Sequence, residues 1–359
     1  MTAWWLALAA GFALALPLTA VARPLARRLG QLDRPGAHKL HARPVPVAGG
    51  VAVLAAVALP LGVALAAAAG GRAAALLPAG LAADLERQAP QLAVLLAGAL
   101  LLHFVGLVDD RVGLGPPVKL LAQAAAALPL VVAFDLRLLP LWLPPAAGVA
   151  LTVLWFVVVI NAFNFLDGLD GLLGGVAAIC AVLLGLTALA TGHLVTAALL
   201  AVLAGALGGF LVFNLPPASI YLGDAGSLVV GHLLAYASIA ITYRDPDAPL
   251  EAPWYAVFVP LVVLAIPLYD FVTVIALRLA ERRDPTRADT NHFPHRLLRR
   301  GMAPRRALAV IWACTLATGM GGVMLIHLEA WQAVLVAAQT AAVLLVLALL
   351  EDVRFRARR

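Results

Sequence analysis

The stretch LVTAALLAVLAGALGGFLVF (residues 194–213) contains no charged side chain. As a helix, it is long enough to cross the hydrocarbon core of a bilayer, which is about 30 Å thick. Similar runs recur along the whole chain of 359 residues, which is 63% apolar and 12% charged and has a mean hydropathy of +0.98. These values exclude an ordinary soluble protein. Period-two alternation is not seen, so we expect helices rather than a membrane β-barrel.

The sequence therefore predicts an all-α fold, a polytopic membrane helix bundle of about eleven transmembrane helices in a single domain, 1–359. The predicted spans are 3–22, 48–70, 91–108, 119–134, 141–162, 172–191, 194–213, 228–243, 254–279, 307–327 and 331–350. We interpret the first as a helix rather than a signal peptide, because Met1–Trp5 has no Lys or Arg. Cleavage after Ala22 is the alternative. Cys180 and Cys314 lie within apolar runs and are expected to be buried.

The charges predict the orientation of the bundle. Of the 25 Lys and Arg residues, 21 fall on one side of the predicted spans and four on the other. The positive-inside rule places the richer side in the cytoplasm, with the N-terminus outside and the C-terminus inside. The loops that carry the candidate residues below are thus expected on the cytoplasmic side of the membrane. These loop positions explain the net charge of +6, so we expect no nucleic-acid partner.

Carboxylates gather at the ends of these spans. Asp109-Asp110, Asp167 with Asp170, and Asp224 all fall on the predicted cytoplasmic face. Each acid alone could cap a helix or lie in a turn. Together they would repel one another at a membrane boundary unless a cation joined them. We therefore predict a metal-dependent site at this face.

Amide and basic side chains lie on the same predicted face. Asn161 and Asn164 precede Asp167 at intervals of three, so a helix would place these side chains on one face. Asn214 precedes the loop that carries Asp224. The last basic loop offers phosphate donors at His292, His295 and Arg296, and the first loop offers Lys39. Topology and anionic lipid are the alternative explanation for such basic loops.

Two acidic or basic positions have a second interpretation. Asp270 lies inside a predicted span, where it is either a functional acid or a carboxylate bonded to neighbouring helices. His41, taken alone, fits a surface residue as well as a ligand.

The donor set suits Mg²⁺, with Mn²⁺ as the alternative ion, because hard cations take carboxylate and phosphate oxygens. Zinc is disfavoured because its Cys/His ligand spacing is missing. A site at the cytoplasmic boundary could join a soluble phosphorylated donor to a lipid-borne acceptor. Phosphoryl transfer is the reaction we expect.

Five ordered motifs from Asp33 to Gly301 resemble those of the polyprenyl-phosphate N-acetylhexosamine-1-phosphate transferases. The motifs are Asp33…Pro35…Lys39…His41…Pro44…Pro46…Gly49-Gly50, Asp109-Asp110…Lys119…Gln123, Asn161…Asn164…Asp167-Gly-Leu-Asp170-Gly, Asn214…Gly223-Asp224…Gly226-Ser227 and Asp289…His292…His295-Arg296-Leu297. Two positions depart from the family pattern, Pro294 where a histidine is usual and His38 where an arginine is common.

The resemblance implies transfer of a sugar 1-phosphate from a UDP-N-acetylhexosamine to undecaprenyl phosphate, with release of UMP. It implies that Asp109 and Asp110 are catalytic and that Asp110 and Asp224 are metal ligands. The substrate-binding residues that it implies are Lys39, His41, Lys119, Asn164, Asp167, Asp170, Asn214, His292, His295 and Arg296. The number of spans is similar to the N-acetylglucosamine branch, which starts envelope polysaccharides such as lipopolysaccharide and teichoic acid.

Three alternatives stay open at this point. The first is transfer of phospho-MurNAc-pentapeptide to the same lipid. The second is a membrane transporter or flippase, and the third is a non-catalytic scaffold. The assembly is also open between a monomer and a homodimer.

Overall fold

The computed structural model describes residues 1–33, 43–139, 142–242, 254–284 and 292–351, and these residues are mostly helical. The helices are α1 (Thr2–Arg28), α2 (Gly49–Ala69), α3 (Ala73–Leu76), α4 (Ala79–Val112), α5 (Pro116–Ala133), α6 (Pro145–Phe165), α7 (Leu172–Ala190), α8 (Leu194–Asn214), α9 (Asp224–Ala240), the 3-10 helix η1 (Trp254–Phe258), α10 (Val259–Val263), α11 (Ala265–Ala280), α12 (Phe293–Arg299), α13 (Pro304–Met324) and α14 (Ala330–Glu351). The two strands are β1 (Leu32–Asp33) and β2 (Val45–Pro46).

The predicted polytopic helix bundle is confirmed. Within the described ranges, nine helices are long and apolar enough to cross a membrane, and a bent pair of helices makes a tenth. The remaining predicted span corresponds to α9, which is apolar but has only 17 residues. The chain is a multi-pass membrane protein.

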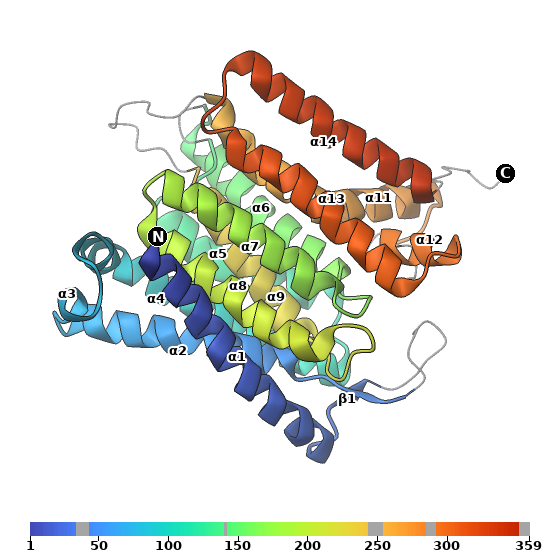
Figure 1. Ribbon diagram of the computed structural model, residues 1–359, viewed down its shortest axis with the longest axis horizontal. Helices are drawn as coiled ribbons and strands as arrows, with labels where there is room; N and C mark the ends of the chain where they lie inside the picture. Colours follow the sequence, from blue (N-terminus) through green and yellow to red (C-terminus); the bar gives the residue numbers. More distant parts are fainter. Residues whose placement is uncertain (34–42, 140–141, 243–253, 285–291, 352–359) are drawn as a thin grey trace.

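Helices α7, α8 and α9 lie at the centre of the bundle (Figure 1). These three helices carry many of the buried side chains. Small residues allow the helices to approach closely, as is usual inside membranes. A Cβ on Gly205 of α8 would lie 2.0 Å from the Leu8 carbonyl oxygen of α1. A Cβ on Gly11 of α1 would lie 2.2 Å from the Val202 carbonyl oxygen.

Helix α9 is held between α4 and α6 in the same way. A Cβ on Gly106 of α4 would lie 2.4 Å from the backbone nitrogen of Ala225, and one on Gly231 of α9 would lie 2.6 Å from the Cα of Ile160. This packing holds the N-terminal half of α9 against the C-terminal parts of α4 and α6, and the candidate site is built at that end.

The structure differs from the sequence-based expectations at three points. The predicted continuous span 254–279 is two segments, which bend by 69° between Val263 and Ala265. Helix α4 continues to Val112, so Asp109 and Asp110 lie in its last turn rather than after it. Helix α6 ends at Phe165, so Asp167 lies beyond the helix and does not continue the row of Asn161 and Asn164.

Backbone hydrogen bonds join the segment between α1 and α2 to the loop between α8 and α9. Strands β1 and β2 pair antiparallel, and Val47 bridges to Tyr221. The Gly49 and Gly50 N–H groups then donate to the carbonyls of Tyr221 and Leu222, each at 2.9 Å. The segment after β2 is thus fixed beside the loop that precedes Asp224.

Candidate functional site

The site contains an ion triad from three helices. The Lys119 ammonium at the start of α5 donates to Asp109 Oδ2 at 2.7 Å and to Asp224 Oδ2 at 3.0 Å. Asp109 Oδ1 also accepts the Leu114 backbone N–H. The Lys119 and Asp224 side chains are 23% and 25% exposed, so this triad is only partly shielded from solvent. Lys119 is therefore a cation that joins two of the acids.

Asn164 completes this cluster from α6. Its Nδ2 donates to Asp224 Oδ1 at 3.0 Å and to Ser227 Oγ at 2.8 Å. Both carboxylate oxygens of Asp224 are thus oriented, one by Asn164 and one by Lys119. Asn161, one turn earlier, donates instead to Gln123 Oε1 at 2.7 Å and does not reach the cluster.

Asp110 connects α4 to the N-terminus of α9. Its Oδ1 accepts the Asp224 N–H at 2.9 Å and its Oδ2 accepts the Ala225 N–H at 3.2 Å. A carboxylate is favourable at this position because unsatisfied N–H groups and the helix dipole make a helix N-terminus positive. The backbone can turn here because Gly223 has φ +72°.

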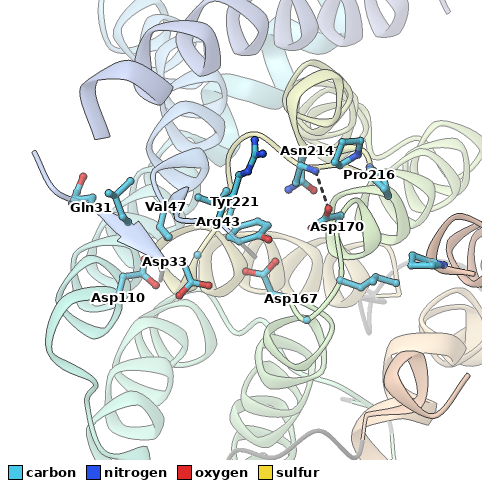
Figure 2. A pocket seen from close by; sticks show the side chains of 18 of the residues that line it. Gln31, Asp33, Arg43, Val47, Asp110, Asp167, Asp170, Asn214, Pro216 and Tyr221 are labelled. Carbon is cyan, nitrogen blue, oxygen red and sulfur yellow. Dashed lines mark hydrogen bonds between the residues drawn. The ribbon is translucent and has the colours of Figure 1, made fainter. Parts of the chain in front are cut away.

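A cavity of ≈ 1390 Å³, lined in part by Asp110, opens next to this cluster, and Figure 2 shows its lining. Its polar lining comes from five chain segments that are far apart in the sequence. The charged and polar residues that line it are Gln31, Asp33, Arg43, Asp110, Arg111, Asp167, Asp170, Asn214, Tyr221, His295 and Arg305. A cavity of this size can hold a nucleotide-sized ligand.

Asp167 faces this cavity between Asp110 and Asp170 (Figure 2). Asp167 is exposed to this cavity, and the protein around the cavity removes only part of the hydration of its carboxylate. The nearby charges of Asp224 and Asp110 repel the anion further. These effects raise the pKa of Asp167 to about 7. Burial and the charge of Asp170 likewise raise the pKa of the Tyr221 hydroxyl.

Asp170 and Asn214 border the cavity and also hold its wall in place. Asp170 Oδ2 accepts the Ala218 N–H at 2.8 Å. Asn214 Oδ1 accepts the Gly171 N–H at 3.0 Å, while its Nδ2 donates to the Ile220 carbonyl at 2.9 Å. The oxygen and the nitrogen of the Asn214 amide are both hydrogen-bonded within the protein, and the residue is 6% exposed. Its main role in the structure is therefore to join the start of α7 to the loop after α8.

The two histidines of the last loop differ in position. His295 lines the cavity, and a Cβ on Gly168 would lie 3.0 Å from its Nε2. His292 lies outside the lining, with its Nδ1 3.0 Å from Asp270 Oδ2 and its ring edge-on to Phe165 at 5.0 Å. Asp270 is thus a carboxylate bonded to a neighbouring element, the second of the two interpretations given above.

Arg296 does not face the cavity, which gives no support to its predicted role as a phosphate donor. It is 8% exposed, and its Nε and Nη2 atoms both lie 2.9 Å from Glu351 Oε2. Lys39 and His41, also predicted to bind substrate, lie outside the described residues.

The carboxylates fit a hard divalent ion only in part. Among the residues that the structure describes, no three His, Cys, Asp or Glu side chains form a metal-binding group. Mg²⁺ needs only one or two carboxylates together with substrate phosphates. Asp110, Asp167 and Asp224 are close enough for their negative charges to repel one another. The hydrogen bonds of Lys119 described above go to Asp109 and Asp224, and not to Asp110 or Asp167. These residues could therefore supply one or two carboxylate ligands to Mg²⁺, with substrate phosphates completing its coordination.

Several lining residues were not predicted as site residues. Asp33 was noted only as part of a motif, Arg111 only among the charges counted for topology, and Tyr221 was not assigned a role. Arg305 was counted only for topology, although it lines the cavity and donates from Nη2 to the Pro216 carbonyl at 3.0 Å. The pairing of the loop at Tyr221 with the segment after β2 could not be seen from local sequence, and it is this pairing that brings Asp33 and Arg43 to the cavity.

The structure is thus a membrane helix bundle with a carboxylate-rich cavity at one end. A family model described as "Glycosyl transferase family 4" matches residues 92–242. A Mycobacterium tuberculosis decaprenyl-phosphate N-acetylglucosaminephosphotransferase is 33% identical over 320 residues, 82% of this chain and 75% of its own length.

Two further relatives agree. An Escherichia coli undecaprenyl-phosphate alpha-N-acetylglucosaminyl 1-phosphate transferase is 28% identical over 305 residues, covering 81% of this chain and 75% of its own. A Bacillus subtilis protein named as a probable undecaprenyl-phosphate N-acetylglucosaminyl 1-phosphate transferase is 25% identical over 327 residues, 88% of this chain and 83% of its own. The chain belongs to the polyprenyl-phosphate hexosamine-1-phosphate transferase superfamily and is a sugar-phosphate transferase.

Proposed function

We propose that this protein transfers N-acetylglucosamine 1-phosphate from UDP-N-acetylglucosamine to undecaprenyl phosphate and releases UMP. The observation that carries the proposal is the convergence of Asp109, Lys119 and Asp224 beside a cavity lined by both acids and arginines. The names of the relatives support the sugar and the lipid. The reaction would take place at the cytoplasmic face of a bacterial inner membrane and start an envelope polysaccharide such as lipopolysaccharide or teichoic acid.

The proposed chemistry is an in-line displacement. An oxygen of the lipid phosphate attacks the sugar-bearing phosphorus, and the bond from that phosphorus to the oxygen of the UMP phosphate breaks. UMP leaves with the bonding electron pair. Arg43, Arg111 and His295 line the cavity and would bind the donor phosphates. Catalysis of this kind consists mostly of positioning and charge neutralisation.

Mg²⁺, with Mn²⁺ as the alternative, is the proposed ion, and Asp110, Asp167 and Asp224 would hold it. When bound, it would neutralise the charge of the diphosphate. No zinc chemistry is proposed.

Asp109 is proposed to position Lys119 rather than to act as a base. Its Oδ2 accepts from the Lys119 ammonium and its Oδ1 from the Leu114 N–H. The lipid phosphate is largely dianionic at neutral pH because the second pKa of a phosphate monoester is about 6. Removal of a proton from the acceptor would therefore contribute little.

The experiment is a reconstituted transfer assay. Purified protein, Mg²⁺ and undecaprenyl phosphate are incubated with UDP-N-acetylglucosamine, UDP-N-acetylgalactosamine or UDP-MurNAc-pentapeptide, and both UMP and the lipid product are measured. We expect product with UDP-N-acetylglucosamine and its loss with EDTA. Product only from the pentapeptide donor would replace the proposed sugar, and counterflow of labelled substrate in vesicles without UMP release would favour a transporter.

A further inference from the structure

The short helix α12 carries His295 into the cavity, and two buried acids outside the cavity hold it. Figure 1 shows α12 beside α11 and the C-terminal end of α14. At its first residue, the Phe293 N–H donates to Asp270 Oδ1 at 2.7 Å, and Asp270 is fully buried. This contact fixes one end of α12 to α11.

The second acid is the last described residue of α14. Glu351 is 3% exposed, and its Oε2 accepts from Arg296 Nε and lies 2.9 Å from Arg296 Nη2. Its Oε1 accepts from the Tyr269 hydroxyl of α11. Arg296 Nη2 also donates to Thr273 Oγ1 at 3.2 Å. One carboxylate thus connects α11, α12 and α14.

The location of this network suggests more than stability. Arg296 follows His295 directly in the sequence, so the residue that pairs with Glu351 adjoins the residue that lines the cavity. A buried ion pair loses much of its Coulomb energy to desolvation and is weak support for stability, but it can fix a geometry. His295 Nε2 also lies close to Gly168, where an added Cβ would come within 3.0 Å of it.

We propose that Glu351 is a positioning residue for the donor site. Through Arg296 it holds α12 so that His295 faces the donor phosphates, although α14 itself does not line the cavity. The binding role of His295 in this inference rests on the proposed function. The anchoring of α12 does not depend on it.

The test is a double-mutant cycle in the full-length protein. Glu351→Gln and His295→Ala should each raise the KM for the UDP-sugar donor by about fivefold or more, with the KM for undecaprenyl phosphate unchanged. In the double variant the effects should not multiply, since residues that act through one another are coupled. Multiplicative effects, or an unchanged donor KM in Glu351→Gln, would overturn the proposal.

Two further variants separate positioning from folding. Glu329→Gln makes the same chemical change at the exposed opposite end of α14, and should leave the donor KM as in the wild type. Tyr269→Phe removes only the hydroxyl that donates to Glu351, and should give a smaller change in the same direction as Glu351→Gln. Tyr269→Phe therefore replaces Glu351→Gln as the test variant if Glu351→Gln does not fold.

Hydrogen exchange measures the anchoring without activity. Glu351→Gln should speed amide exchange in residues 293–299 by about tenfold or more, whereas Glu329→Gln should not. Unchanged exchange would refute the anchoring. If the wild type released no UMP with any donor, the proposed function would fail, and the exchange result would still decide whether Glu351 holds α12.

Discussion

Lys119 is a cation that balances part of the negative charge of the nearby acids. The sequence predicts that the clustered carboxylates need a positive charge beside them, and it predicts a metal ion in that role. Lys119 was instead expected to bind the substrate. In the structure, the Lys119 ammonium lies between Asp109 and Asp224. Part of the repulsion among the acids is therefore already balanced by the chain itself.

Replacing Lys119 with Gln should leave Asp109 and Asp224 facing each other without this ammonium. We expect a loss of stability of about 1–2 kcal/mol, since the pair is partly solvated and screened. Added Mg²⁺ should then raise the melting temperature more in Lys119→Gln than in the wild type, because it can replace the missing charge. Thermal unfolding in detergent with and without Mg²⁺ measures this, and Lys119→Arg is the matched control. Equal Mg²⁺ effects in the variant and the wild type would contradict it.

Asp167 should make stability depend on pH. Its pKa of about 7 in the folded protein lies above the ordinary value of 3.8, so the folded state keeps a proton that the unfolded state has lost. The contribution of this residue is therefore most favourable at low pH and decreases as the pH rises from about 4 to about 7. Asp167→Asn is neutral throughout and should gain stability over the wild type across that window.

The measurement for Asp167 is the difference in melting temperature between variant and wild type, taken in EDTA from pH 4.5 to 8. EDTA is needed because a bound divalent ion would favour the anion. Asp135→Asn, at a 59% exposed side chain, is the control for a charge change outside the cavity. A difference that stays constant with pH would show that Asp167 keeps an ordinary pKa.

The limits of sequence reasoning at the residue scale are clear at Arg296. A basic residue beside two histidines in a basic loop fits a phosphate donor, and nothing local distinguishes it from one. Its partner Glu351 lies 55 positions away, at the end of another helix. By contrast, the acids at 109, 110, 167, 170 and 224 could be predicted, because carboxylates at the ends of apolar spans are costly without a function.

At the scale of elements, the site depends on how closely α9 approaches α4. Gly223 turns the chain into α9 with φ +72°, and a Cβ there would lie 2.5 Å from Val47 Cγ1 and 2.6 Å from Asp110 Oδ2. A side chain at this position would strain the backbone and also push the capping carboxylate of Asp110 away from α9.

Gly223→Ala should therefore abolish transfer activity and destabilise the protein by more than the roughly 1–3 kcal/mol of backbone strain alone. Gly192→Ala is the matched control, because Gly192 has φ +77° but a Cβ there would meet nothing within 4 Å. Gly192→Ala should lose stability through backbone strain but keep its transfer activity. Activity assays and thermal unfolding compare the two. Similar losses in both variants would show that crowding at Asp110 is unimportant.

Element boundaries were predictable where hydropathy alone decides them and were wrong where packing does. The spans corresponding to α7 and α8 follow from uninterrupted apolar runs. The bend between α10 and α11 does not, because residues 254–279 are apolar on both sides of it and other proline-containing helices here, such as α1, are continuous. Only the tertiary environment decides which proline-containing segment breaks.

At the scale of the whole molecule, the polar residues of the candidate site gather at one end of the bundle. The last turns of α4 and α6 and the first turns of α5 and α9 meet there, and the hairpin after α1 closes over them. Helix α4 has 34 residues, so its two ends lie about 50 Å apart. The site is thus confined to one membrane boundary, and the charge distribution predicts that this boundary faces the cytoplasm.

Cysteine labelling tests this orientation. In a background with Cys180→Ala and Cys314→Ala, Arg111→Cys should react with a membrane-impermeant maleimide only in inside-out vesicles, and Arg72→Cys only in right-side-out vesicles. Both positions are exposed and lie near opposite ends of α4. Labelling of Arg111→Cys only in right-side-out vesicles would reverse the topology and place the cavity outside the cell, where a UDP-sugar donor is not supplied.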